Sequence, residues 1–219
     1  MLKKNLLSIL KQIENGNNLG EQIQLVGATK TVPVETINEA IGLGLKIVAE
    51  NRVQEFNSKH GLIFGAEEHF IGHLQTNKVK YLVGKVSLIQ SVDSFNLANK
   101  IDIQAKKKST VQDVLIEINV GGELSKSGFF LENINAEIDN ISKLENVRIK
   151  GLMAMLPKSD DKLYLKSLCV KVRNVFDSLK ADYPSFQYLS MGMSGDYQIA
   201  IENGSNMIRL GSSIFGARK

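Results

Sequence analysis

The chain has 219 residues, of which 43% are hydrophobic, so it can bury a sizeable and mainly aliphatic core. The formal net charge of +4 is a mild, scattered excess of lysine and arginine, which argues against a nucleic-acid-binding surface. The single cysteine, Cys169, excludes an intramolecular disulfide and suits a reducing compartment. No apolar run approaches membrane-spanning length. We therefore expect a soluble cytoplasmic protein.

The first half of the chain predicts alternating helices and strands. A helix over residues 2–14 precedes an apolar strand over 23–30, which ends on Lys30 and is closed by Pro33. Hydrophobic spacing then predicts a helix over 34–44, a strand over 46–50, a helix over 53–60, a strand over 69–74, a helix over 76–83, a strand over 86–92 and a helix over 95–106.

The second half repeats this alternation. The clearest helical stripe runs from Leu165 to Leu179 and places Cys169 in the core. The segments predicted here are a strand over 113–120, a helix over 131–144, a strand over 150–156, the helix over 165–179, a strand over 188–191, a helix opening at Ser194-Gly-Asp196 and a strand over 207–210.

Eight strands thus alternate with helices, after one extra N-terminal helix. Such alternation implies parallel strands joined by helical crossovers. Eight units are the number of a closed (β/α)8 TIM barrel, so we expect one α/β domain spanning residues 1–219. The alternative is an open doubly wound sheet, which commonly has five or six strands.

In a TIM barrel the carboxyl ends of the strands carry the functional site. One main cation, a few amides and hydroxyls, and no acidic cluster indicate a site for an anionic ligand. The strand ends predicted from the sequence are Lys30, Asn51, Leu74, Gln75, Ser91 to Asp93, Asn119, Met155, Ser190 and Arg209 to Ser212.

Lys30 is unusual because it ends an apolar strand. A buried ammonium is costly and its pKa falls, and a partly neutral lysine can attack an aldehyde to form a Schiff base. Our hypothesis is that Lys30 holds pyridoxal phosphate. The alternative is a lysine whose amine reaches solvent from the strand end.

The last two units predict a phosphate site. Ser194 opens a helix, and Gly211 and Ser212 follow the eighth strand, where TIM barrels often bind phosphate through backbone N–H groups. Taken singly, Ser194 is also a suitable N-cap and Gly211 a suitable turn residue. Arg209 shares a face with Gly211, so it either points at a pyridine nitrogen or pairs with an interior carboxylate such as Glu117.

Two other patterns are rejected. His69 and His73 lie four residues apart in a predicted strand, roughly 13 Å at about 3.3 Å per residue, too far to share a metal ion. Residues 121–128 look superficially like a P-loop but lack its glycine-lysine-serine order, which favours a surface or site-edge loop. We expect no metal site.

A series of ordered motifs covers nearly the whole chain. They are ATKTVP (28–33), ENRVQE (50–55), HFIGHLQTNK (69–78), QSVDS (90–94), INV (118–120), SKSG (125–128), GLMAM (151–155), LSMGMS (189–194) and IRLGSSIFGAR (208–218). In these motifs the chain resembles the pyridoxal phosphate homeostasis proteins, which share their barrel with the N-terminal domain of alanine racemase. The resemblance implies a fold type III pyridoxal phosphate protein.

The resemblance also implies the roles of individual residues. The first-strand lysine of the family, which forms the internal Schiff base with pyridoxal 5′-phosphate, falls on Lys30. The serines of the strand-seven motif fall on Ser190 and Ser194. The Arg-x-Gly-Ser motif falls on Arg209, Gly211 and Ser212, and these residues are implied to bind the phosphate and face the pyridine nitrogen. Asn51 is added as a further cofactor-binding residue, and no catalytic residue is assigned.

Racemases similar in their barrel use a tyrosine from a second, β-rich domain. We expect that domain to be absent, because the chain ends at Lys219, directly after the last barrel unit. The implied activity is therefore to hold pyridoxal phosphate and release it to apo-enzymes that depend on it, without robust catalysis and as a monomer. The alternatives are a small racemase or transaminase-like enzyme, and a regulatory module whose cofactor occupancy controls a partner protein.

Overall fold

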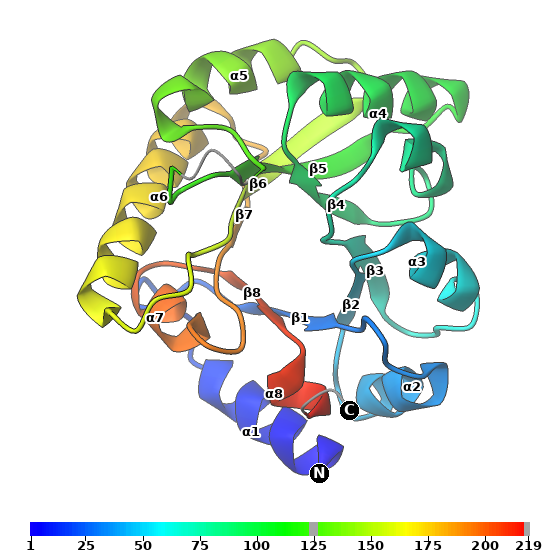
Figure 1. Cartoon of the computed structure of the whole chain (residues 1–219), viewed down its shortest axis with the longest axis vertical. Coiled ribbons are helices and arrows are strands. Elements are labelled where there is room, and N and C mark those ends of the chain that lie inside the picture. The colour runs from blue at the N-terminus through cyan, green and yellow to red at the C-terminus, as the bar shows by residue number, and fades with distance from the viewer. Residues whose placement is uncertain (123–126, 217–219) are drawn as a thin grey trace.

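The computed structural model describes residues 1–122 and 127–216. Eight parallel strands close into a barrel in their order along the chain, with β1 paired to β8 (Figure 1). The prediction of a (β/α)8 barrel is confirmed. The strands are β1 (Gln24–Ala28), β2 (Ile47–Glu50), β3 (Glu67–Phe70), β4 (Leu88–Val92), β5 (Gln112–Ile118), β6 (Val147–Ala154), β7 (Tyr188–Ser190) and β8 (Met207–Leu210).

Helices surround the barrel, and the extra N-terminal helix is confirmed. That helix lies beside the last short helix, where Asn5 Nδ2 donates to the carbonyl oxygen of Ile214 at 3.3 Å. The α-helices are α1 (Leu2–Ile13), α2 (Val34–Gly42), α3 (Val53–Lys59), α4 (Phe95–Lys107), α5 (Ile134–Ile141), α6 (Lys162–Asp182), α7 (Tyr197–Glu202) and α8 (Ser212–Phe215), and the 3-10 helices are η1 (Thr76–Tyr81) and η2 (Leu131–Asn133).

The core forms an inner and an outer layer. Inside the barrel, the apolar cluster includes Val26, Leu88, Leu115 and Met207, and it closes the barrel below the carboxyl ends of the strands. Outside, the strands pack against the helices; α6 contributes the predicted stripe, including the buried thiol of Cys169. This packing makes the barrel a rigid support for the loops that follow each strand.

The structure corrects several predicted boundaries. The strand predicted over 69–74 is wrong in its position along the chain, because β3 ends at Phe70 and His73 lies in the following loop. The loop turns tightly there: a Cβ at Gly72 would lie 2.0 Å from the carbonyl oxygen of Asn51. The helix predicted to open at Ser194 begins at Tyr197.

A further correction concerns β6, which begins at Val147 rather than at residue 150. The pairing of β5 with β6 shifts register between Val114 and Leu115, and Gly151 adopts a φ of +142° there. The predicted strand over 150–156 thus contained this glycine but missed the first three residues of β6.

Residues 1–122 and 127–216 contain neither a membrane-spanning helix nor a metal-binding cluster of side chains. No helix in these ranges combines the length and apolar character needed to cross a lipid bilayer. Nor do three histidine, cysteine, aspartate or glutamate side chains gather there closely enough to hold a metal ion.

Candidate cofactor site

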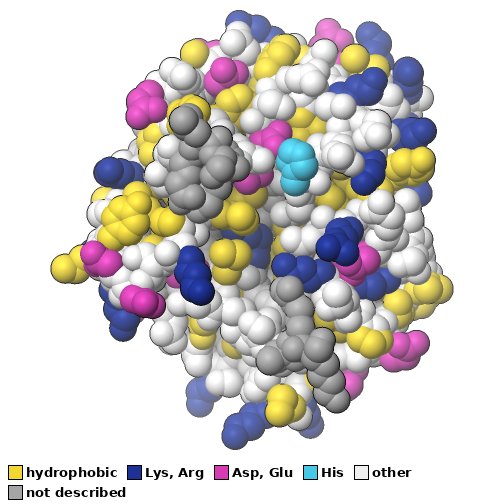
Figure 2. Space-filling model, viewed as in Figure 1, with side chains coloured by type: hydrophobic (Ala, Val, Ile, Leu, Met, Phe, Trp, Pro, Cys, Tyr) yellow, Lys and Arg dark blue, Asp and Glu magenta, His cyan; other side chains and the backbone are white. Residues whose placement is uncertain are grey.

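The strand ends form a pocket of about 250 Å³. Of the seven residues predicted to bind the cofactor, six line it: Lys30, Asn51, Ser194, Arg209, Gly211 and Ser212. Their elements lie next to one another at the β1, β2, β7 and β8 side of the barrel. Lysine and arginine side chains lie within and beside the hollow at the centre of this face (Figure 2). The fold therefore brings together residues that are up to 182 positions apart, the separation of Lys30 and Ser212.

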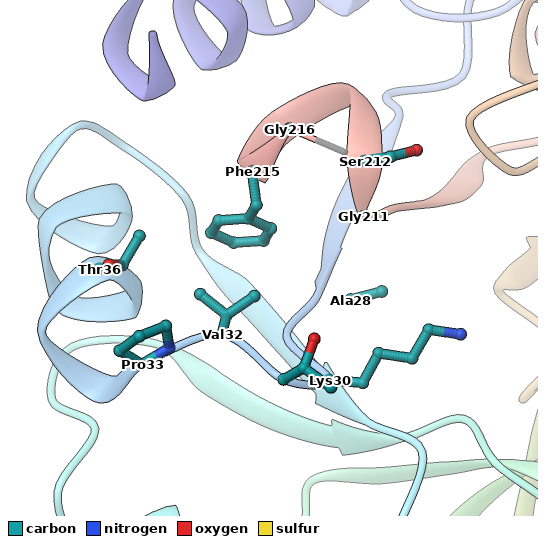
Figure 3. Close-up of a pocket in the computed structure, with 10 residues that line it drawn as sticks. Ala28, Lys30, Val32, Pro33, Thr36, Gly211, Ser212, Phe215 and Gly216 are labelled. Carbon is teal, nitrogen blue, oxygen red and sulfur yellow. The ribbon is translucent and has the colours of Figure 1, made fainter. Parts of the chain in front are cut away.

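Lys30 lies two residues beyond the end of β1, in a turn rather than in the predicted strand. A second pocket of about 350 Å³ adjoins the first and shares Lys30, Gly211 and Ser212 with it. Figure 3 shows the side chains of Lys30 and Ser212 pointing away from Pro33 and Thr36. The lysine amine is therefore placed where the two pockets meet.

Arg209, on β8, is held rigidly beneath the pocket. It is 5% exposed, and its Nη1 donates to the carbonyl oxygen of Ser190 at 2.9 Å and to Ser190 Oγ at 2.6 Å. Its Nη2 donates to the carbonyl oxygen of Ala154 at 3.0 Å. Burial lowers the pKa of Arg209 to about 10, and the negative charge of Glu117 opposes that shift, so the guanidinium stays charged at neutral pH. Arg209 therefore lines the pocket, and among the described residues Glu117 acts on it through space rather than through an ion pair.

Ser190, the seventh predicted residue, is fully buried behind Arg209. Its hydroxyl donates to Gln90 Oε1 at 2.7 Å, and Gln90 Nε2 lies 3.1 Å from His69 Nδ1. A polar chain therefore runs through the barrel interior from Arg209 to His69 and sets the orientation of the guanidinium. The sequence analysis named Gln90 and His69 without this role, because their contacts join strands β3, β4 and β7.

Two serines and a glycine in the segments after β7 and β8 also line the pocket. Ser194 Oγ accepts a hydrogen bond from the backbone N–H of Ser213 at 3.3 Å, which ties the loop after β7 to α8. Gly211 is the residue before α8, and Ser212 is its first residue. Hydroxyls and backbone amides at this position suit an anion such as a phosphate group.

Glu117, named in the sequence analysis only as a possible partner of Arg209, lies on the β5 side of the site. Glu117 and His73 line a pocket of about 230 Å³ that shares Asn51 and Met155 with the first. Burial, and secondarily the charge of Asp93, raise the pKa of Glu117 to about 7. Asp93 Oδ2 also lies 3.1 Å from His73 Nδ1. The site is therefore cationic toward β8 and partly acidic toward β5.

The polar groups that line the pocket suit the functional groups of pyridoxal phosphate. Asn51 Oδ1 is buried at the pocket wall without a hydrogen-bond partner among the described residues, so it is available to a ligand. Lys30 supplies an amine, Arg209 a fixed donor, and Ser194 and Ser212 hydroxyls. Part of the SKSG motif (residues 125 and 126) and Arg218 lie outside the described residues.

Comparison with known proteins identifies the family of this chain. The family model of the alanine racemase N-terminal domain matches residues 1–219. The pyridoxal phosphate homeostasis protein of Aquifex aeolicus is 44% identical over 221 residues, covering 100% of this chain and 97% of that protein. The protein of the same name from Escherichia coli K12 is 35% identical, over 90% of this chain and 87% of that protein.

Solved structures of related proteins have the same fold. PipY of Synechococcus elongatus PCC7942 with pyridoxal phosphate bound matches with a TM-score of 0.87 and 29% identity, covering 99% of this chain and 100% of PipY. Alanine racemase of Clostridium difficile shares the fold alone, with a TM-score of 0.75 and 19% identity over 99% of this chain and 57% of that enzyme. The chain belongs to the alanine racemase N-terminal domain family and, within it, to the pyridoxal phosphate homeostasis proteins.

Proposed function

We propose that this protein binds pyridoxal 5′-phosphate in the 250 Å³ pocket, holds it covalently on Lys30, and serves cofactor homeostasis by releasing it to apo-enzymes. The observation that carries the proposal is the convergence of Lys30, Arg209 and the serines on one pocket, in a chain that matches the cofactor-bound PipY over its full length. The names of its relatives support the homeostasis role.

Each side chain has a definite task in this proposal. When bound, pyridoxal phosphate supplies an aldehyde that condenses with an amine to a Schiff base, and a phosphate group. Lys30 provides the amine, while Ser194, Gly211 and Ser212 bind the phosphate through hydroxyls and backbone amides. Asn51 offers its buried amide oxygen to a donor on the ligand.

Arg209 favours holding the cofactor over catalysis. A guanidinium only donates hydrogen bonds and stays charged, so beside a pyridine nitrogen it keeps that nitrogen unprotonated. An unprotonated ring withdraws electrons weakly, which makes it a poor sink for the carbanion that amino-acid chemistry needs. Three hydrogen bonds hold the guanidinium of Arg209 in place, which supports this proposal.

The first test is an absorption spectrum of the purified protein before and after borohydride reduction, followed by peptide mapping. We expect an absorption band that reduction removes, and a stable mass increase on the peptide that contains Lys30. The Lys30→Ala variant is the control for that peptide. No band in the presence of excess pyridoxal phosphate would refute the cofactor assignment.

A second test separates a carrier from an enzyme. We expect the loaded protein to activate an apo-enzyme that depends on pyridoxal phosphate, and to leave the α-proton of alanine unexchanged in deuterated water beyond the rate of the Lys30→Ala variant. Exchange above that rate would favour a racemase or transaminase-like activity. Failure to activate the apo-enzyme would contradict delivery while leaving binding intact.

A further inference from the structure

A buried cation holds the backbone just before Lys30. Lys59, the last residue of α3, is 8% exposed, and its Nζ donates to the carbonyl oxygen of Thr29 at 2.8 Å. The same Nζ donates to Glu50 Oε1 at 2.7 Å, and the hydroxyl of Thr29 donates to that oxygen at 2.7 Å. The residue preceding Lys30 is thus bound through both its backbone and its side chain.

A carboxylate of the same group holds the backbone just after Lys30. Glu55 Oε2 lies 3.5 Å from Lys59 Nζ and accepts a hydrogen bond from the backbone N–H of Thr31 at 2.7 Å. Thr31 has a φ of +63°, which is unfavourable for a β-branched residue. The turn that carries Lys30 is therefore strained, and Glu55 holds the strained residue in place.

Lys59, Glu50 and Glu55, here called the Lys59 cluster, act on both strand ends of the site. Glu50 is the last residue of β2, directly before Asn51, so the cluster links the turn of Lys30 to the loop of Asn51. The cluster lies between α3 and the ends of β1 and β2, beneath that turn.

Stability alone is a weak reason for this arrangement. Taking a lysine and a glutamate out of water costs several kcal/mol, and the attraction between them only roughly offsets that cost. Packed apolar side chains would stabilise the same space equally well. A charged donor aimed at one backbone carbonyl does something that apolar packing does not: it fixes the direction of the peptide next to Lys30.

We propose that the Lys59 cluster is a set of positioning residues that fix the backbone on both sides of Lys30 and thereby aim its amine into the pocket. The inference rests on the proposed function in one respect, that Lys30 is the residue which reacts with pyridoxal phosphate. Lys59 acts through Thr29 and, by way of Glu55, through Thr31.

The test compares Lys59→Met with the wild-type protein. Methionine keeps the length of the side chain and removes the donor. We expect covalent attachment of pyridoxal phosphate to Lys30, followed by absorbance and peptide mapping, to slow on the order of ten- to a hundredfold, because a small misplacement of a reacting group has effects of that size. Binding of 4-deoxypyridoxine phosphate, which lacks the aldehyde, should change less than about twofold, because the residues proposed to bind the phosphate lie in the loops after β7 and β8.

Glu55 gives a matched pair of variants. Glu55→Ala removes the acceptor for the N–H of Thr31, and we expect slower attachment to Lys30. Glu55→Gln keeps an acceptor oxygen, and we expect it to restore most of the wild-type rate. Equal rates for the two variants would contradict the role assigned to Glu55.

Arg173→Met is the control for general destabilisation. Arg173 pairs with Glu21 at 2.6 Å, and its side chain is 12% exposed, against 11% for Lys59. We expect this variant to lose stability without slowing attachment to Lys30. If Arg173→Met slows attachment as much as Lys59→Met does, or if Lys59→Met leaves the rate unchanged, the proposal is overturned.

A measurement without cofactor separates this proposal from the proposed function. The rate at which an acetylating reagent modifies Lys30 in the cofactor-free protein is followed by peptide mapping across a range of pH. We expect Lys59→Met, but not Arg173→Met, to change that rate at least about threefold at one or more pH values. A threefold change in rate corresponds to the free energy of part of one hydrogen bond. If wild-type protein forms no adduct with pyridoxal phosphate, the proposed function fails, and this measurement alone decides whether the cluster positions Lys30.

Discussion

Replacing Glu117 by glutamine is expected to raise the free energy of unfolding near pH 8 and to change it little near pH 4.5. Glu117 is 8% exposed on β5, and burial and the nearby Asp93 raise its pKa from 4.5 to about 7. The folded protein therefore binds this proton more tightly than the unfolded chain. Its contribution is most favourable below about pH 4.5 and is lost as the pH rises through 7.

The size of the effect follows from the pKa shift. A shift of about 2.5 pKa units corresponds to about 3 kcal/mol of unfolding free energy, at roughly 1.4 kcal/mol per unit. Glutamine resembles the protonated carboxyl at every pH, so it avoids this loss. Arg209 contributes no pH dependence in this range, because its pKa of about 10 lies above it.

Urea unfolding near pH 4.5 and near pH 8 measures the effect. We expect the unfolding free energy of Glu117→Gln, relative to wild type, to rise by about 3 kcal/mol between the two values. Glu14→Gln, at an exposed glutamate that follows α1, is the matched control and should show no such change. A difference between Glu117→Gln and wild type that is the same at both pH values would refute the assigned electrostatic cost.

Three further predictions follow from backbone geometry and burial. Gly151→Ala should lower the free energy of unfolding in urea by at least about 3 kcal/mol, since its Cβ would lie 1.9 Å from the carbonyl oxygen of Tyr188. Gly42→Ala, in open space at the end of α2, should raise it by about 0.5 kcal/mol. Equal effects of the two substitutions would contradict this reasoning. Cys169 should resist a thiol reagent until the protein unfolds, because burial raises its pKa to about 11; rapid labelling of folded protein would count against it. The free energy of unfolding of Lys30→Ala should lie within about 0.5 kcal/mol of the wild-type value, because Lys30 lies beyond β1. A larger loss would show that Lys30 also supports the fold.

The barrel itself could be predicted from the sequence because its signal is local. Each strand is an apolar run and each helix an amphipathic stripe, so counting eight alternating units was enough to infer closure. The pocket residues followed from the same logic: strand ends meet at one face, and six of the seven proposed cofactor-binding residues line one pocket. Their roles toward the cofactor remain proposals.

The boundary of β3 and the start of α7 were not predictable in this way. β3 ends at Phe70 because the next turn packs Gly72 against the backbone of Asn51, a contact between two loops. The helix after β7 begins at Tyr197, and the hydroxyl of Ser194 accepts a hydrogen bond from the N–H of Ser213 in α8 instead of capping that helix. Both features depend on neighbours that local hydrophobic spacing does not describe.

The sequence by itself determined the architecture and the lysine around which the site is built. Only the tertiary structure decided what surrounds that lysine. It places Ser190 behind Arg209, brings Glu117 near Asp93, and sets Lys59 against the backbone of Thr29. The physical reason is that periodicity records which face of an element is buried, whereas hydrogen bonds and pKa values depend on side chains that meet from different strands across the barrel.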